Sequence, residues 1–141
     1  MKTLHEIVES LDDLLINEDA FTDGVWRRPD PDLKLRIKAK PLGDDYSDAQ
    51  ARRQRKAAKG FGGDVNRIPA ALRRKINAEC LVEFSLLDVE NCVIGGKELS
   101  FEEFCALILE PRGQKLLTLA FTAAGMATEQ QEEEAEEAEG N

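Results

Sequence analysis

The stretch 95–104 has the residue types that come closest to a metal site. Its Gly-Gly turn and the glutamate at Glu103 resemble the second half of a calcium loop, whose last position is a bidentate glutamate. With Glu103 at that position, however, Cys92, Ile94 and Gly96 fall where a hard cation needs carboxylate or amide oxygens. The spacing therefore predicts an ordinary loop followed by a capped helix, and we expect neither a metal nor a cofactor.

The sequence also lacks the motifs that nucleophilic catalysis requires. His5 is the only histidine, and Cys80, Cys92 and Cys105 are widely spaced, with no C-x-x-C pair and no G-x-S-x-G elbow. No Walker phosphate loop occurs. Three cysteines in a chain without a signal peptide are typical of reduced cytosolic thiols, each a small core residue. The residue types predict a protein that is not an enzyme.

A basic run around Arg52, Arg53 and Arg55 is the third candidate for chemistry. Such a run can contact phosphates, but aromatic stacking platforms are missing and only Phe61 lies nearby. Nucleic-acid binding is therefore the least favoured of three alternatives. The other two are a solvated helix face and a face that binds protein or the chain's own acidic tail.

Charge is distributed unevenly along the chain. Residues 27–75 hold 15 Lys/Arg against 6 Asp/Glu, a balance of +9, whereas the remainder holds 4 against 22, a balance of −18. The sum is the net charge of −9. A basic middle joined to an acidic end favours a binding or assembly factor that engages charged surfaces. No apolar run reaches the ~18 residues of a membrane span.

The elements that must position these residues are mostly helical. Leu33 to Lys40 alternates apolar and basic residues with period 2, and with Val25-Trp26 before it predicts a hairpin near 25–40. In that strand Leu33, Leu35, Ile37 and Ala39 should face the core. Capping signals predict three helices, one after residues 3–6, one over 48–59 after Ser47-x-x-Gln50, and one after Ser100-x-x-Glu103. Two further helices are expected from Pro69 to about Leu87 and over 116–126. A small hairpin is expected within 89–99.

The predicted architecture is a mainly α (α+β) fold. Residues 1–128 form a single helix-rich domain with a short N-terminal β-hairpin, and residues 129–141 form a disordered acidic tail with seven glutamates. The last helix is apolar nearly all round. Such a helix is central to the core, or has an excess face that another subunit covers.

The order of features resembles the small phage tail assembly chaperones of long-tailed phages and prophages. The resemblance rests on Asp23-Gly24-Val25-Trp26, the alternating strand, Pro41-Leu42-Gly43-Asp44-Asp45-Tyr46, the Ala/Arg helix, Glu98-Leu99-Ser100-Phe101 and a Glu-rich end. It covers the chain up to about Met126. Many family members have a Trp in the helix near 80–87, where this chain has Phe84 and Ser85.

The resemblance implies a non-enzymatic chaperone that binds the tape-measure protein and recruits subunits of the major tail-tube protein. It would act in the host cytoplasm and be absent from the mature virion. Self-association stays open. The alternatives are a structural virion component, such as a tail or head-tail completion protein, and a nucleic-acid-associated regulator. The candidate protein-binding residues are Trp26, Leu35, Ile37, Arg52, Arg53, Arg55, Leu117 and Phe121.

Overall fold

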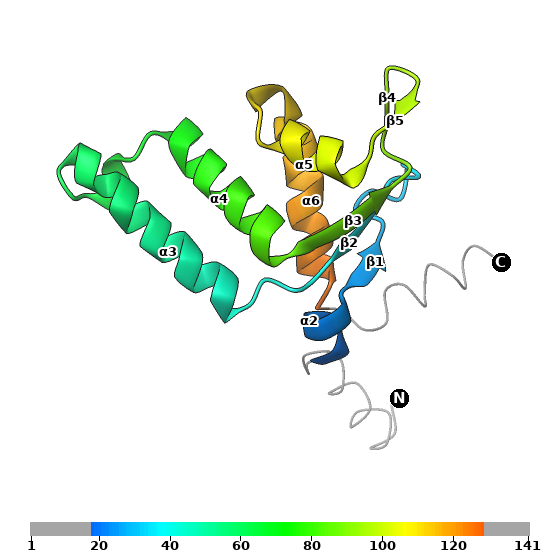
Figure 1. Ribbon diagram of the computed structural model, residues 1–141, viewed down its shortest axis with the longest axis horizontal. Helices are drawn as coiled ribbons and strands as arrows, with labels where there is room; N and C mark the ends of the chain where they lie inside the picture. Colours follow the sequence, from blue (N-terminus) through cyan, green and yellow to red (C-terminus); the bar gives the residue numbers. More distant parts are fainter. Residues whose placement is uncertain (1–17, 129–141) are drawn as a thin grey trace, which may run out of the picture.

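A computed structural model describes residues 18–128, and it confirms a mainly helical α+β fold (Figure 1). The helix expected after residue 3 and the acidic tail lie outside the described residues. Within 18–128 no helix combines the length and the apolar character needed to cross a membrane.

A three-stranded antiparallel sheet in the order β1-β2-β3 forms one part of the fold. β1 (Val25–Arg27) and β2 (Arg36–Ala39) are the predicted hairpin, with Trp26 opposite Lys38. The third strand, β3 (Leu86–Glu90), pairs with the other edge of β2.

The predicted strand at 33–40 is correct in its phase and wrong at its start. Leu35, Ile37 and Ala39 are buried as the alternation predicted, but Leu33 is 44% exposed and β2 begins only at Arg36. Leu33 belongs instead to a turn, since its N–H donates to the carbonyl oxygen of Asp30 at 3.0 Å.

The helix predicted to reach about Leu87 ends earlier, at Phe84. Ser85 follows it, and its hydroxyl donates to the carbonyl oxygen of Lys40 at 2.5 Å while the Lys40 N–H donates back to the Ser85 carbonyl at 2.8 Å. This reciprocal pair with the end of β2 directs the chain into β3. The small hairpin expected next is present as β4 (Val93–Ile94) and β5 (Lys97–Glu98).

Two long helices, α3 (Asp44–Ala58) and α4 (Ala70–Phe84), form an arm that extends from the sheet (Figure 1). The cap predicted at Ser47 is wrong, because α3 begins four residues earlier than predicted, at Asp44 after Gly43. Two aspartates occupy that first turn, where the helix dipole favours negative charge, and Tyr46 is buried there. The arm turns through η2 (Lys59–Phe61), two glycines with φ of 72° and 77°, and η3 (Val65–Arg67).

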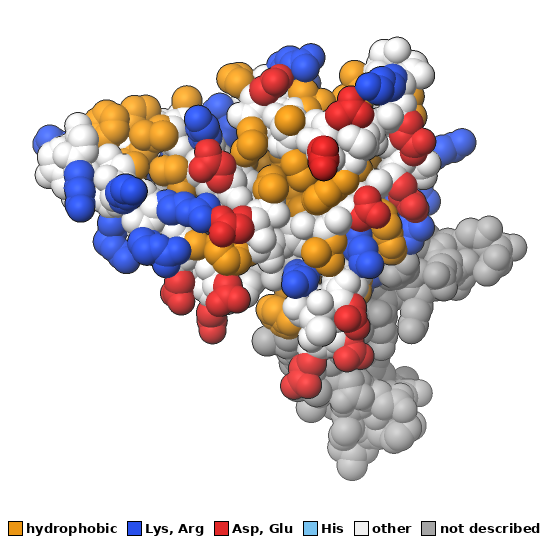
Figure 2. Space-filling view, viewed as in Figure 1, with side chains coloured by type: hydrophobic (Ala, Val, Ile, Leu, Met, Phe, Trp, Pro, Cys, Tyr) orange, Lys and Arg blue, Asp and Glu red, His pale blue; other side chains and the backbone are white. Residues whose placement is uncertain are grey.

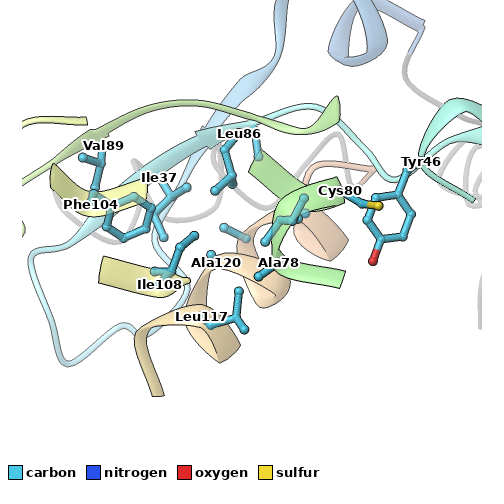
Figure 3. Packing of buried hydrophobic residues seen from close by; sticks show 14 of the residues in the cluster. Ile37, Tyr46, Ala78, Cys80, Leu86, Val89, Phe104, Ile108, Leu117 and Ala120 are labelled. Atoms are coloured by element: carbon cyan, nitrogen blue, oxygen red, sulfur yellow. The ribbon is translucent and has the colours of Figure 1, made fainter. Parts of the chain in front are cut away.

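The remaining helices are α2 (Glu18–Asp23), α5 (Phe101–Ile108), η4 (Pro111–Gly113) and α6 (Gln114–Met126). The predicted capping box is confirmed, with the Ser100 hydroxyl and the Glu103 side chain each accepting from the other residue's N–H. Side chains from the sheet, α4, α5 and α6 meet in one core (Figure 3), which includes Ile37, Ala78, Cys80, Phe104, Ile108, Leu117 and Ala120. α6 is thus a central helix.

Candidate protein-binding surface

A cleft of about 360 Å³ separates the first half of α4 from the turn that joins α5 to α6. Ala78 and Ile108 are buried at this cleft, while Leu72 is half-buried and Leu109 is 36% exposed. Figure 2 shows hydrophobic side chains in the hollow between the arm and α5. The full lining is Ala71, Leu72, Arg74, Lys75, Ala78, Ile108, Leu109, Glu110 and Pro111. We call it the α4–α5 groove.

The α4–α5 groove carries more positive than negative charge at its rim. Arg74 and Lys75 come from α4, and neither forms an ion pair within residues 18–128. The one acidic lining residue, Glu110, is already paired with Arg112, whose Nε lies 2.6 Å from its carboxylate. An apolar groove with this rim fits an amphipathic helix that has acidic residues beside its apolar stripe.

Polar contacts between α3 and α4 fix the arm that forms one wall of the groove. Asn77 accepts through Oδ1 from the amides of Gln50 at 2.8 Å and Gln54 at 3.3 Å. Arg53 donates to the carboxylate of Glu83 and, at 3.5 Å, to the sulfur of Cys80. The arm is therefore a helical pair held by side-chain hydrogen bonds along its length.

A second hollow of similar size lies where α2 meets the start of α3. Phe21 and Phe84 contribute its aromatic lining, and Asp44, Asp45 and Glu83 make it acidic, with Lys40 the one basic lining residue. The two hollows thus have opposite charge and would select different partners.

Four predicted binding residues are placed in or against the protein's own core. Leu35, Ile37 and Leu117 are buried in the main cluster, and Phe121 is half-buried against it. The ring of Phe121 meets that of Tyr46 edge-on at 6.5 Å, which joins α6 to α3. An outside partner cannot reach Leu117 without opening the fold.

Trp26 is half-buried on β1, with the guanidinium carbon of Arg36 5.3 Å from its ring centroid. Arg36 also donates to Glu90 on β3 at 2.8 Å. The side chains of Trp26, Arg36 and Glu90 thus connect the three strands across one face of the sheet. This face is separate from the α4–α5 groove.

The three predicted arginines of α3 fall on two different faces. Arg53 faces α4, where it donates hydrogen bonds to Glu83 and Cys80. Arg52 and Arg55 are exposed, and with Lys56 and with Lys59, which continues α3 as the first residue of η2, they occupy positions i, i+3, i+4 and i+7 of one helical face. We call these four residues the α3 basic stripe; Figure 2 shows Lys and Arg side chains gathered over α3.

The cysteines are suited to packing rather than to reaction. Cys80 and Cys92 are buried and Cys105 is half-buried, all three as free thiols. Burial raises the pKa of Cys105 to about 11 and also raises the pKa values of Cys80 and Cys92. Among residues 18–128 no group of His, Cys, Asp and Glu side chains is arranged to hold a metal ion.

Sequence reasoning missed the α4–α5 groove. Leu109 lies at the C-cap of α5, where the helix ends. The one available signal was the Pro111-x-Gly113 break, where η4 follows α5 and Pro111 lines the groove. Comparison of the chain with family models, with curated proteins and with solved structures found no match.

Proposed function

We propose that this protein is a non-enzymatic assembly chaperone that holds an amphipathic helix of a partner protein in the α4–α5 groove. In keeping with the sequence resemblance, the proposed partner is a phage tape-measure protein, and the chaperone would bring it to the major tail-tube protein. It would act in the host cytoplasm and would not remain in the virion.

The observation that carries the proposal is the combination of an apolar groove and unpaired cations at its edge. Leu109 is exposed although it lies beside the core, and Arg74 and Lys75 have no acidic partner within the described residues. A long helical protein with apolar stripes aggregates unless those stripes are covered. A groove between two helical elements supplies such a cover, and its basic rim selects the acidic flank of the bound helix.

A structural virion protein is the second candidate. The edges of the three-stranded sheet favour it, because β1 and β3 each pair only with β2 among the described strands, and a neighbouring subunit could add a strand there. The two roles differ in where the protein is found. A chaperone is absent from purified virions, whereas a structural component is present in fixed stoichiometry.

Co-expression with the cognate tape-measure protein tests the proposal. We expect the wild-type chain to raise the soluble fraction of that partner and to co-purify with it. Leu109→Glu should abolish co-purification because it places a carboxylate in the groove. Leu33→Glu is the matched control, since Leu33 is also an exposed leucine but lies in a distant turn. Circular dichroism of both variants establishes that they fold.

Charge reversal at the rim provides an independent measurement. Lys75→Glu should weaken co-purification, and raising the salt concentration should weaken the wild-type complex, because rim charges act through screened attraction. If a folded Leu109→Glu protein still retains the partner, the groove is not the binding site. If wild-type protein never co-purifies but is found in virions, the structural role replaces the chaperone role.

A further inference from the structure

The α3 basic stripe is a concentrated positive surface without a partner inside the described fold. Arg52, Arg55, Lys56 and Lys59 are exposed, and none of them forms an ion pair within residues 18–128. Arg53, one position away from Arg52, is by contrast fully engaged with α4. Four adjacent cations on one helix face repel one another, so an anionic ligand there would relieve that repulsion.

The same chain carries a ligand of the complementary charge. Residues 129–139 contain seven glutamates and no basic residue. This segment follows Thr128 directly after α6, and α6 is itself joined to α3 by the ring contact of Phe121 with Tyr46. We propose that the acidic segment 129–139 docks on the α3 basic stripe of its own molecule and covers it.

The length of the segment permits this contact. From Thr128 back to Phe121 along α6 is about 10 Å, and from Tyr46 to Lys56 along α3 is about 15 Å, at the helical rise per residue. The rings bridge the two helices at 6.5 Å between centroids. With about 4 Å for each aromatic side chain, the path totals roughly 40 Å to Lys56 and roughly 34 Å to Arg52, and both are upper limits because a straight line is shorter. Residues 129–139 in extended form span about 36 Å or slightly more.

Because the acidic segment is covalently attached to α6, weak ion pairs are enough to dock it on the α3 basic stripe. A tethered segment faces its target at an effective concentration on the order of millimolar, whatever the protein concentration. Each exposed ion pair contributes little, but several together hold the segment over the stripe at low salt. The docked segment would act as an internal polyanion that keeps acidic proteins and phosphate backbones away from α3.

Carbodiimide cross-linking of the full-length protein, read by mass spectrometry, tests the proposal. The reagent joins a carboxylate to an amine in contact with it, so we expect links from the segment 129–139 to Lys56 and Lys59. Their yield should be independent of protein concentration, and at about 1 M salt, where the screening length is ~3 Å, they should disappear.

Arginine substitutions separate the electrostatic attraction from the cross-linking chemistry. Arg52→Gln with Arg55→Gln leaves both lysine amines in place, and we expect it to reduce the links about threefold or more. The matched control is Arg67→Gln with Arg112→Gln, which removes the same charge from two exposed positions outside the stripe. It should leave the links nearly unchanged.

Three results would overturn the proposal. Equal losses in the two double variants would show that only net charge matters. Links spread evenly over Lys34, Lys75 and the stripe lysines would show that the segment has no preferred site. A yield that rises with protein concentration would assign the contact to a second copy of the chain.

Discussion

Arg27 donates from Nε to the carbonyl oxygen of Met126 at 3.2 Å and so joins β1 to the last turn of α6. The two residues are 99 positions apart in sequence, and only 2% of the Arg27 surface is exposed. The same guanidinium donates from Nη1 to the Trp26 carbonyl at 3.0 Å. A cation at a helix C-terminus is favourably placed against the helix dipole, so this contact holds the end of α6 against the sheet.

Replacing Arg27 by methionine should therefore destabilise the protein by about 1–3 kcal/mol, the range for losing a buried charged donor. Methionine preserves much of the apolar volume, so the loss reports mainly on hydrogen bonding. The measurement is the free energy of unfolding in urea. Lys34→Met serves as the control, because Lys34 is exposed. Equal stability of the two variants would show that the arginine contributes nothing net.

Gly113 must remain a glycine for α5 and α6 to pack. A Cβ atom there would lie 2.1 Å from the Leu107 carbonyl oxygen and 2.8 Å from its carbonyl carbon, both backbone atoms of the preceding helix. We expect Gly113→Ala to cost about 1–3 kcal/mol, the typical range for overpacking.

Gly125, near the end of α6, is expected to tolerate the same change. Among residues 18–128, no heavy atom outside the backbone of its own helix lies within 4 Å of the position its Cβ would take, so Gly125→Ala should raise stability by about 0.5–1 kcal/mol through helix propensity. Thermal unfolding of both variants measures the contrast. A stabilising Gly113→Ala would mean that α5 and α6 approach less closely than described.

Ile37 and Lys38 test the strand that sequence periodicity predicted. Ile37 is fully buried between Arg27 and Val89 of the neighbouring strands, while Lys38 is half-exposed opposite Asp88. Ile37→Asp should cost several kcal/mol, on the order of 3–5, because it buries an unpaired carboxylate. Lys38→Gln should change stability by less than about 0.5 kcal/mol. Urea unfolding that gave equal losses would contradict the register of β2.

Sequence patterns correctly predicted the parts of the fold that depend on interactions between residues close together in the chain. The alternation around Ile37 and the capping box at Ser100 depend on residues a few positions apart, and both are present. The end of α4 at Phe84 depends instead on a hydrogen bond from Ser85 to Lys40, which is 45 positions away. Burial of Arg27 depends on Met126. No periodicity in the sequence encodes such long-range partners, so their effect could not be predicted.

The candidate site also combines features that local sequence patterns predict with features that depend on long-range contacts. The sequence predicted a solvated or ligand-binding face for the whole basic run, and the structure exposes Arg52 and Arg55 but turns Arg53 toward α4. Leu117 was expected at a partner surface because α6 is apolar nearly all round, but the sheet, α4 and α5 surround α6 and use that area internally. The groove beside Leu109 arises from how α5 ends against α4, which is a tertiary property.

Acid should weaken the fold through Glu103. A hydrogen bond from Lys97 Nζ at 2.8 Å, together with the N–H of Ser100 at 3.1 Å, lowers the pKa of this carboxyl from 4.5 to about 2. Because the folded-state pKa is depressed, the stabilisation is present above pH 4.5 and is lost as the pH falls toward 2.

Glu103→Gln isolates that contribution, since glutamine still accepts from the Ser100 N–H but carries no charge for Lys97. We expect the wild-type protein to melt at a higher temperature than the variant near neutral pH, and the difference to shrink as the pH falls from 4.5 to about 2. Circular dichroism melts across this range provide the measurement. Glu102→Gln, which changes an exposed glutamate in the same turn, is the matched control and should show no such convergence. A wild-type advantage that persisted unchanged at the acid end would mean that the Lys97–Glu103 pair does not stabilise the folded state.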